Sequence, residues 1–465
     1  MKTYQDLLAV GEDEKQRMDF IRQAINEHKS SQAYQLALDA ELYFKGENPT
    51  INRYEKIIYD LQGRAHRDMY TANHKIASSF FGFDVRQEVS YLLGNGVMFR
   101  EEATKKRLGK KFDLMMVKAA RYALVSGISF GLFNLDHVDV FKLTEFAPLY
   151  DEENGALMAG VRFWQVAEDK PLRATLYEVD GYTDYIQRKG EDMSVLEEKR
   201  TYIQKVRTSR ADGTEIYEGQ NYPSFPIVPL RNGENALSEL VGKRNTLDAL
   251  DLCTSNMVNN VDEGNLIYWV LQNADGMNDL DDQKFLDKVR TMHIVHAGSV
   301  EDEKATAEPH TIEAPFQGTD ATINMLKRKL YEDFQAFDSS AVSAGNQTAT
   351  AIAASYTPLD LKVDDFEASV TEFILGLLKL AGIDDEPSYT RSRIINRAEE
   401  TQTILMGAEY YDDEYITKKL LTINGDADQY DALMERKAAE ETERVEEESD
   451  FRPQEETEVT GDAET

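Results

Sequence analysis

The chain has 465 residues, with 52 Lys and Arg against 85 Asp and Glu, a formal net charge of −33 and a single cysteine. At roughly 150 residues per domain, this length predicts two to four domains or one elaborated domain, with ample chain for a buried core. The lone Cys253 excludes an internal disulfide framework and any multi-cysteine metal site, and it fits a reducing compartment. Because no secretory signal or stretch of ~20 apolar residues is present, we expect a soluble protein without a membrane partner.

The acidic character argues against a protein that grips DNA. Affinity for DNA of any sequence comes mostly from Lys and Arg that neutralise phosphates, whereas this chain has a pI near 4.6. Residues 440–465 contain 12 Asp and Glu but only 2 Arg, and we expect this acidic tail to be disordered. The remaining 73 acidic and 50 basic residues still leave the body strongly negative.

The N-terminal region reads as helical. Apolar periodicity predicts helices at residues 14–29 and 32–44, the second stopped by Gly46. A third helix is predicted around residues 84–93, where Asp84 and Gln87 resemble a capping box. A fourth is expected at residues 113–125, with Gly127 at its end.

From residue 128 to about 229 the pattern changes to short β-branched and aromatic runs. Turn signals such as Asn154-Gly155 and Asp180-Gly181 separate these runs, which predicts an antiparallel sheet. A Pro-marked segment, FPIVPLRN, then enters a long helix predicted at residues 238–261.

After this helix, a small mixed insertion precedes two further long helices. Residues 265–315 are predicted to hold strands and a short helix, and helices are predicted at 320–337 and 364–382. A stretch of small residues, SSAVSAGNQTATAIAAS, lies between these two helices. Two or three shorter helices are expected between residues 388 and 443.

Motifs of catalysis are scarce. The chain has no G-x-x-x-x-G-K-[ST] phosphate loop and no G-x-S-x-G nucleophile elbow, so it is not expected to be a nucleotide-driven motor or a serine hydrolase. Cys253 falls within a predicted helix and reads as structural. His293 and His296 would lie on opposite faces of a strand, which argues against metal ligation. We therefore predict no catalytic residue, no metal and no cofactor.

Two charged features have competing interpretations. The carboxylate pairs Asp281-Asp282 and Asp364-Asp365 could belong to a metal-dependent nuclease, but such pairs arise by chance among 85 acidic residues. Lys327, Arg328 and Lys329 form the densest basic cluster of the second half. On a helix they spread around the axis, which favours a solvated or subunit-contact role over a DNA-facing one.

The order of these parts resembles the portal proteins of tailed bacteriophages, in the branch typical of long-tailed phages of Gram-positive hosts. The resemblance covers roughly residues 50–440 and is carried by three stretches: NHKIASSFFGFDVRQEVSYLLGNGV, FPIVPLRNGENALSELVGKRNTLDALDLCTSNMVNNVDE and AGNQTATAIAASYTPLDLKVDDFEASVTEFILGLL. In one departure, the family's small-residue motif often reads GN-x-SG, whereas here Gly345-Asn346 precedes Gln347-Thr348-Ala349.

The resemblance implies an α+β portal fold that is mainly α, with a β-rich wing module and a small mixed clip. The implied parts are the wing (1–236), first stem helix (237–262), clip (263–317), second stem helix (318–338), tunnel loop with the long wing helix (339–387), crown (388–439) and acidic tail (440–465).

The implied function is a ring, commonly a dodecamer, at one capsid vertex in the virion. It would conduct double-stranded DNA during terminase-driven packaging and during ejection, without sequence specificity. It would also nucleate head assembly in the host cytoplasm. Expected partners are therefore other copies of the chain, terminase, the major capsid and scaffold proteins, and head-completion or adaptor proteins. A net-negative ring would repel the duplex and keep it sliding.

Two sets of residues are candidates for this role. The stretch before the third long helix is a candidate tunnel loop, in which Pro358 would break the helix; an ordinary helix connection, or residues 339–348 in its place, are the alternatives. Its residues are Tyr356, Thr357, Pro358, Leu359, Asp360, Leu361 and Lys362. In the clip, Leu266, Ile267, Trp269 and Val270 are candidates for a subunit or terminase interface, with core packing as the alternative for Trp269. Rival functions are an acidic metal-dependent nuclease and an adaptor or scaffold unrelated to DNA.

Overall fold

The computed structural model describes most of the chain and divides it into two compact units. The described residues are 2–59, 63–69, 71–208, 215–263, 268–272, 306–310, 316–340, 349–392, 397–424, 429–430 and 432–437. One unit comprises Met1–Ser340 and Ser355–Ser392, and the other comprises Ala341–Ala354 and Arg393–Thr465. The acidic tail predicted at 440–465 lies outside the described residues.

The predicted N-terminal helices are confirmed. The helices are α1 (Tyr4–Val10), α2 (Glu14–Ser30), α3 (Gln32–Lys45) and α4 (Pro49–Arg53). The Asp13 and Ser31 side chains accept the backbone N–H of Gln16 and Tyr34, so each fixes the start of its helix. Gly46 adopts a left-handed conformation at the end of α3, which a residue with a Cβ would adopt only at a cost.

The next helices correct one prediction. They are α5 (Phe80–Leu93), α6 (Glu102–Arg107) and α7 (Phe112–Ser126), followed by Gly127 in the left-handed region as predicted. The capping box predicted at Asp84 is wrong. Helix α5 begins after Ser79, and Asp84 lies fully buried one turn inside it, where it is paired with a lysine of another helix.

The β-rich segment forms antiparallel sheets, as predicted. One sheet has the strand order β10-β9-β8-β7-β6 and another has the order β13-β4-β5. The strands are β4 (Ile128–Asn134), β5 (His137–Lys142), β6 (Phe146–Tyr150), β7 (Leu157–Trp164), β8 (Leu172–Glu178), β9 (Gly181–Gln187), β10 (Ser194–Arg200) and β13 (Ile227–Arg231), with a 3-10 turn at Leu143–Glu145. Gly155 has a φ of 68°, which suits the predicted Asn-Gly turn between β6 and β7.

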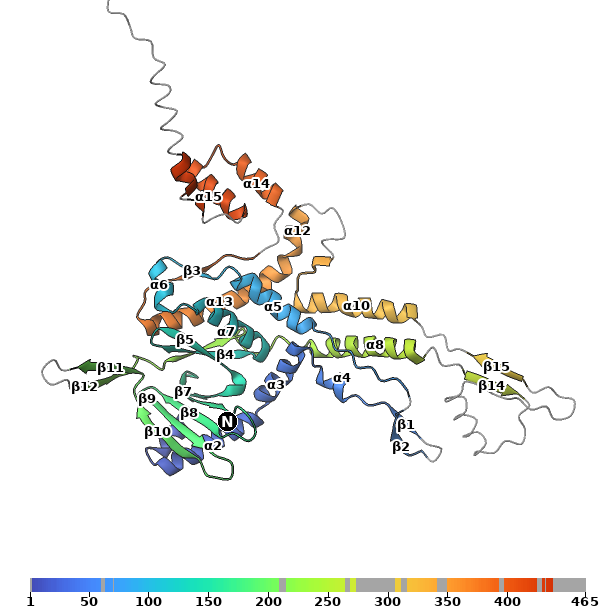
Figure 1. Ribbon diagram of the computed structural model, residues 1–465, viewed down its shortest axis with the longest axis horizontal. Helices are drawn as coiled ribbons and strands as arrows, with labels where there is room; N and C mark the ends of the chain where they lie inside the picture. Colours follow the sequence, from blue (N-terminus) through green and yellow to red (C-terminus); the bar gives the residue numbers. More distant parts are fainter. Residues whose placement is uncertain are drawn as a thin grey trace, which may run out of the picture. The chain divides into compact units, whose positions relative to one another are not determined.

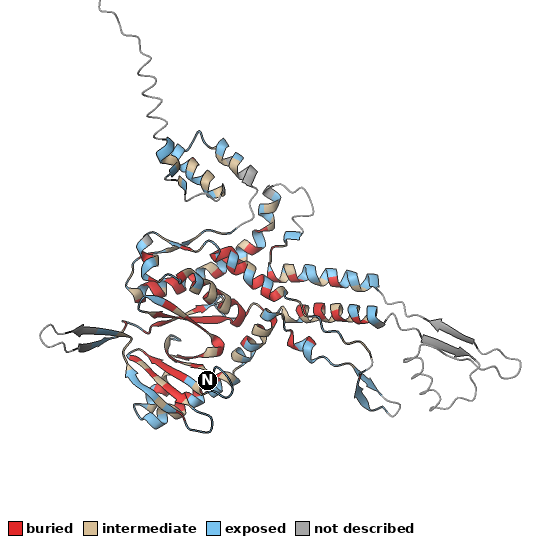
Figure 2. Ribbon diagram, viewed as in Figure 1, coloured by how far each residue is buried: buried red, intermediate tan, exposed pale blue. Residues whose placement is uncertain are grey.

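Helices cover these sheets and bury the core. Phe20, Ile21 and Ile25 of α2 pack in one cluster with Val161 and Leu176 of the larger sheet. Helices α7 and α13 (Thr357–Ala381) contact the smaller sheet. Figure 2 shows the resulting concentration of buried residues on β7, β8, β4 and α13. The chain is thus a mixed α and β protein, which confirms the predicted class.

Short antiparallel ribbons connect or extend these elements. They pair β1 (Ile57–Tyr59) with β2 (Ala65–Arg67), β11 (Ile203–Thr208) with β12 (Glu215–Gln220), β14 (Tyr268–Gln272) with β15 (Thr306–His310), and β3 (Val97–Phe99) with β16 (Pro387–Tyr389). The pairing of β3 with β16 was not predicted, because three-residue strands leave no periodic signal.

The long helices begin and end where the backbone is interrupted. Helices α8 (Arg244–Glu263) and α10 (Phe316–Phe334) contact each other and lie side by side (Figure 1). Helix α8 starts six residues later than predicted, after Gly242 with a φ of 80°, and α10 ends before Gln335 with a φ of 52°. The remaining helices are α12 (Ala349–Ser355), α14 (Arg397–Met406) and α15 (Asp413–Asn424). Among the described residues, no helix combines the length and apolar character needed to cross a membrane.

Candidate functional site

Helix α8 is held from one side by a ladder of polar contacts. Its residues Asp251, Ser255 and Asn259, spaced four apart and therefore on one face, are all buried. Their side-chain oxygens accept the backbone N–H groups of Ser78 (2.9 Å), Ile76 (3.0 Å) and His74 (2.7 Å). An extended segment thus runs antiparallel to α8 with alternate amides bonded to it.

The ladder continues toward the start of α8. The Asn48 amide donates to Asp248 at 2.9 Å and to Asp251 at 2.8 Å, and the Tyr43 hydroxyl donates to Asp248 at 2.6 Å. Burial and the Asp248 carboxylate raise the pKa of Tyr43 to about 12, so its hydroxyl keeps its proton well into the alkaline range. Sequence reasoning missed these residues. The available signal was the four-residue spacing of Asp251, Ser255 and Asn259, which places three polar side chains on one face of the predicted helix.

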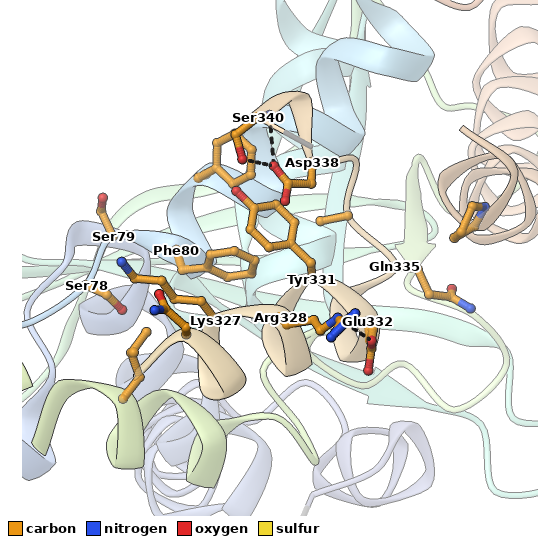
Figure 3. A pocket seen from close by; sticks show the side chains of 15 residues that line it. Ser78, Ser79, Phe80, Lys327, Arg328, Tyr331, Glu332, Gln335, Asp338 and Ser340 are labelled. Carbon is orange, nitrogen blue, oxygen red and sulfur yellow. Dashed lines mark hydrogen bonds and ion pairs between the residues drawn. The ribbon is translucent and has the colours of Figure 1, made fainter. Parts of the chain in front are cut away.

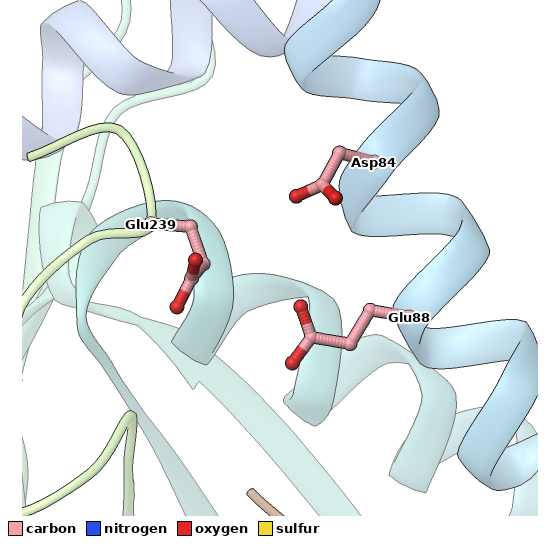
Figure 4. A group of neighbouring side chains, drawn as sticks. All are labelled: Asp84, Glu88 and Glu239. Atoms are coloured by element: carbon pink, nitrogen blue, oxygen red, sulfur yellow. The ribbon is translucent and has the colours of Figure 1, made fainter. Parts of the chain in front are cut away.

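A buried charge cluster joins three segments near the same helix. Figure 4 shows Asp84 and Glu88 on α5 facing Glu239, which lies in the turn before α8. The Lys362 ammonium of α13 lies 3.0 Å from Asp84 Oδ2, 2.7 Å from Glu88 Oε2 and 3.4 Å from Glu239 Oε2. The Lys362 side chain is only 8% exposed, so these charges interact with little solvent screening.

The surroundings shift the pKa values of the three carboxyl groups in different directions. Burial raises the pKa of Asp84, and it raises the pKa of Glu88 to about 7 despite the nearby Lys362. Burial also acts on Glu239, but the charges of Lys362 and Lys243, the latter 2.6 Å away, lower the pKa of Glu239 to about 2. At neutral pH Glu239 is therefore ionised, whereas Asp84 and Glu88 bind a proton more readily than exposed carboxyl groups do.

The three carboxylates do not form a convincing metal site. One oxygen from each lies within 4.8 Å of the others, which is a spacing that a cation could bridge. The Lys362 ammonium, however, is already within ion-pair distance of all three groups and supplies the positive charge that a metal would bring. The cluster reads as a structural joint between α5, α13 and the turn before α8.

An open groove of about 1120 Å³ lies beside α10. Phe80, Phe83 and Tyr331 line it, and Figure 3 shows the rings of Phe80 and Tyr331 close together. Their centroids are 5.0 Å apart with an interplanar angle of 90°, an edge-to-face contact. The groove also has charged residues on its walls, among them Lys327 and Glu332. An aromatic floor with mixed charges at its edges can accept a protein surface.

The predicted basic cluster at 327–329 is partly neutralised within α10. Lys329 lies 2.9 Å from Asp333, and Arg328 lies 3.8 Å from Glu332. Both pairs are solvent-exposed and have the four-residue spacing of helix neighbours. This arrangement favours the solvated or subunit-contact interpretation over a DNA-facing one.

The candidate tunnel loop is helical in the structure. Tyr356 precedes α13, and Thr357 to Lys362 form its first turns. The predicted interruption lies just before Pro358, since α12 ends at Ser355 and α13 begins at Thr357. Pro358 occupies the first turn of α13, where its missing N–H has no helical partner to lose. The Tyr356 ring is stacked between Tyr91 and Phe337, at centroid distances of 5.6 and 4.0 Å.

The seven candidates divide between the core and the surface. Tyr356 and Leu359 are buried and Asp360 is half-buried, whereas Thr357, Pro358 and Leu361 are exposed. Lys362 belongs to the buried charge cluster.

The clip candidates are only partly described. Leu266 and Ile267 lie outside the described residues. Trp269 and Val270 belong to β14, in register with Pro309 and Glu308 of β15. His293, His296, Asp281 and Asp282 also lie outside the described residues. Asp364 lies on α13, 2.6 Å from Arg391, and is thus engaged in an ion pair.

Comparisons with known proteins cover most of the chain. A family model described as phage portal protein, SPP1 Gp6-like, matches residues 23–450. A portal protein of Bacillus phage SPP1 is 23% identical over 423 residues, which cover 83% of this chain and 79% of that protein. A portal protein of Clostridium phage phiCD119 is 22% identical over 397 residues, which cover 78% of this chain and 84% of the relative.

Solved structures give weaker likenesses. A chain in the virion of a native gene transfer agent particle aligns with a TM-score of 0.41 and 11% identity, over 73% of this chain and 88% of that one. A chain in the neck of an empty gene transfer agent particle gives a TM-score of 0.41 and 12% identity, over 74% and 90%.

Proposed function

Because this chain belongs to the SPP1 Gp6-like family of phage portal proteins, we propose that it forms a ring-shaped channel for double-stranded DNA at one vertex of a phage capsid. The observation that carries the proposal is the family match itself, which extends over residues 23–450 and so includes both paired helices and the segment between them. Portal proteins are components of the virion. We propose assembly in the host cytoplasm and a closed ring of identical subunits, with a dodecamer as the expected number.

The division into parts follows the same proposal. Residues 1–236 would form the wing, α8 and α10 the stem, 263–317 the clip, 339–387 the tunnel loop and long wing helix, and 388–439 the crown. The side-by-side packing of α8 and α10 supports a stem, and the separate compact unit that holds α14 and α15 supports a crown. The ribbon of β14 and β15 supports a clip between the stem helices.

The charge of the chain supports transport rather than retention of DNA. Each phosphate that pairs with Lys or Arg releases counterions and favours binding, so a channel that must let DNA slide benefits from few free cations. The net charge of −33 per chain, repeated around a ring, would repel the duplex. Within α10, the pairing of Lys329 and Arg328 with acidic neighbours acts in the same direction.

A channel-facing role of the stretch at 356–362 can now be tested on its exposed members only. Leu361 is 60% exposed, whereas Leu375 of the same helix is 42% exposed and serves as a matched control. We expect Leu361→Asp, but not Leu375→Asp, to reduce the amount of DNA packaged in a complementation assay. If both variants package equal amounts of DNA, the channel-facing role of this stretch is wrong.

The ring proposal also predicts the partners. The clip, including Trp269 and Val270, would contact neighbouring subunits or the terminase. Scaffold, capsid and head-completion proteins would bind the assembled ring. If Trp269→Ala leaves ring formation, terminase docking and thermal stability unchanged, the clip role of Trp269 is wrong.

Negative-stain electron microscopy of the purified chain, alone and co-expressed with the scaffold and capsid proteins of its phage, tests the ring. We expect closed rings with an axial hole under at least one of these conditions. A protein that remains monomeric or dimeric in all of them would refute the proposal and favour an adaptor.

We propose a structural role without catalysis. The rival, a metal-dependent nuclease, needs converging carboxylates and a metal, whereas Lys362 occupies the centre of the described carboxylate cluster. Incubation of the protein with duplex DNA and Mg²⁺ or Mn²⁺ separates the two functions. Turnover that follows the protein through purification would establish the nuclease.

A further inference from the structure

The hairpin of β1 and β2 exposes apolar side chains on both of its faces. Ile57 is 58% exposed, Ile58 is 41% exposed and Tyr59 is 71% exposed. Successive residues of a strand point to opposite faces, so each face of this ribbon carries at least one exposed apolar side chain. Met69, two residues after β2, is 76% exposed. Isolated two-stranded hairpins are marginally stable in water, so this one gains from a surface to pack on.

The base of the hairpin is firmly attached to its own chain. Asp68 is buried, its N–H donates to the Lys56 carbonyl at 2.9 Å, and its carboxylate accepts the N–H of Thr71 at 3.1 Å. Beyond Thr71, the ladder of His74, Ile76 and Ser78 fixes the segment to α8. The hairpin is therefore an arm with an anchored root and an exposed apolar end.

The charge of the arm is opposite to that of the chain. Residues 55–67 contain three Lys and Arg and one His against two acidic residues, within a chain of net charge −33. Arg67 forms a 3.4 Å pair with Glu55 across the arm, in which both side chains are more than half exposed. A surface of this sign is complementary to most of the surface of another copy of the same chain.

We propose that the β1–β2 hairpin docks on a second copy of this chain and is a clasp between neighbouring subunits. DNA would supply phosphates for the basic side chains, but it would leave the aliphatic side chains of Ile57 and Ile58 in water. A protein surface removes them from water and supplies acidic groups as well. The inference rests on the proposed ring, because it needs neighbouring copies held close together.

The first test compares two double variants of the full-length protein. Ile57→Asp with Tyr59→Asp places two charges on the arm. Leu8→Asp with Val166→Asp places the same two charges on apolar residues that are 60% and 85% exposed elsewhere. At the concentration where half of the wild-type chain is in rings, we expect the arm variant to reduce the ring fraction at least tenfold by native mass spectrometry. The control should stay within twofold, and both monomers should keep the wild-type circular dichroism and melting temperature.

A second test identifies the surface on which the arm docks. A photoreactive maleimide is attached to Tyr59→Cys in a Cys253→Ser background, and isotopically light and heavy chains are mixed before assembly. We expect light–heavy cross-linked peptides that fall in one region of the neighbouring copy. Cross-links confined to one chain, or an unchanged ring fraction in the arm variant, would overturn the clasp while leaving the ring intact. Rings that persist but lose DNA retention would assign the arm to DNA, and a wild-type chain that never forms rings would refute the proposed function itself.

Discussion

The buried Lys362 cluster gives the sharpest test of the fold. Replacement of Lys362 by Met keeps most of the side-chain volume and removes the ammonium that lies 2.7 to 3.4 Å from three carboxylates. At an effective dielectric constant of about 20, one contact at ~3 Å amounts to roughly 5 kcal/mol of attraction before desolvation is counted. Protonation of Asp84 or Glu88 would recover part of that loss. We therefore expect Lys362→Met to cost about 3–5 kcal/mol of folding free energy, the range for breaking a buried ion pair.

Urea unfolding at pH 7.5, followed by the fluorescence of Trp164 in a Trp269→Phe background, measures this cost within the unit that holds the cluster. Lys329→Met is the matched control, because its pair with Asp333 is largely exposed and worth about 0.2–1 kcal/mol. Addition of Glu88→Gln to Lys362→Met removes one of the stranded charges and should restore at least ~1 kcal/mol. If Lys362→Met is no more destabilised than Lys329→Met, the cluster does not join α5 to α13 energetically.

Three further predictions follow from other contacts. The pKa of Glu88 is about 7 in the folded protein, against 4.5 for an ordinary glutamate. Between these pH values the folded state binds more protons than the unfolded state, so the free energy of unfolding should fall as pH rises from about 4.5 to 7. Glu88→Gln should flatten this dependence, and an unchanged slope of unfolding free energy against pH in urea titrations would contradict the prediction. Asp251→Ala removes the acceptor for the Ser78 N–H and the Asn48 amide and should cost about 1–3 kcal/mol of folding free energy. Amide hydrogen exchange should accelerate at Ser78, Ile76 and His74 together. Acceleration confined to Ser78 would show that the three hydrogen bonds of the ladder are not cooperative. In Gly160→Ala, the new Cβ would lie within 3 Å of the Phe146 ring, which should cost about 1–3 kcal/mol by overpacking; an unchanged melting temperature would mean that β7 can shift away from that ring.

Local signals predicted much of the architecture. Gly46 and Gly127 end helices in the structure as predicted, and the predicted starts at residues 14 and 32 directly follow Asp13 and Ser31, which cap these helices. The turn at Asn154-Gly155 separated strands correctly. These features depend on residues close together in the chain, so periodicity and turn chemistry are sufficient to find them.

The wrong and missing predictions fall at positions whose structure depends on residues far away in the sequence. Asp84 has the sequence context of a cap, but Lys362, 278 residues away, draws it into the core. The pairing of Pro387 with Phe99 and the contacts of Asp251 with Asn48 and Ser78 likewise join segments whose proximity no local pattern encodes.

The polar ladder along α8 has a mechanical consequence. One residue of helix corresponds to a rotation of about 100° and a rise of about 1.5 Å, so a slip of α8 by one residue would turn Asp251, Ser255 and Asn259 away from their amides simultaneously. The segment from His74 to Ser78 is thus mechanically coupled to the helix. If α8 turns about its axis, either three hydrogen bonds break together or the segment moves with the helix. Since the same segment leads into the hairpin at one end and into α5 at the other, a small rotation of the helix would become a sideways displacement of the exposed arm.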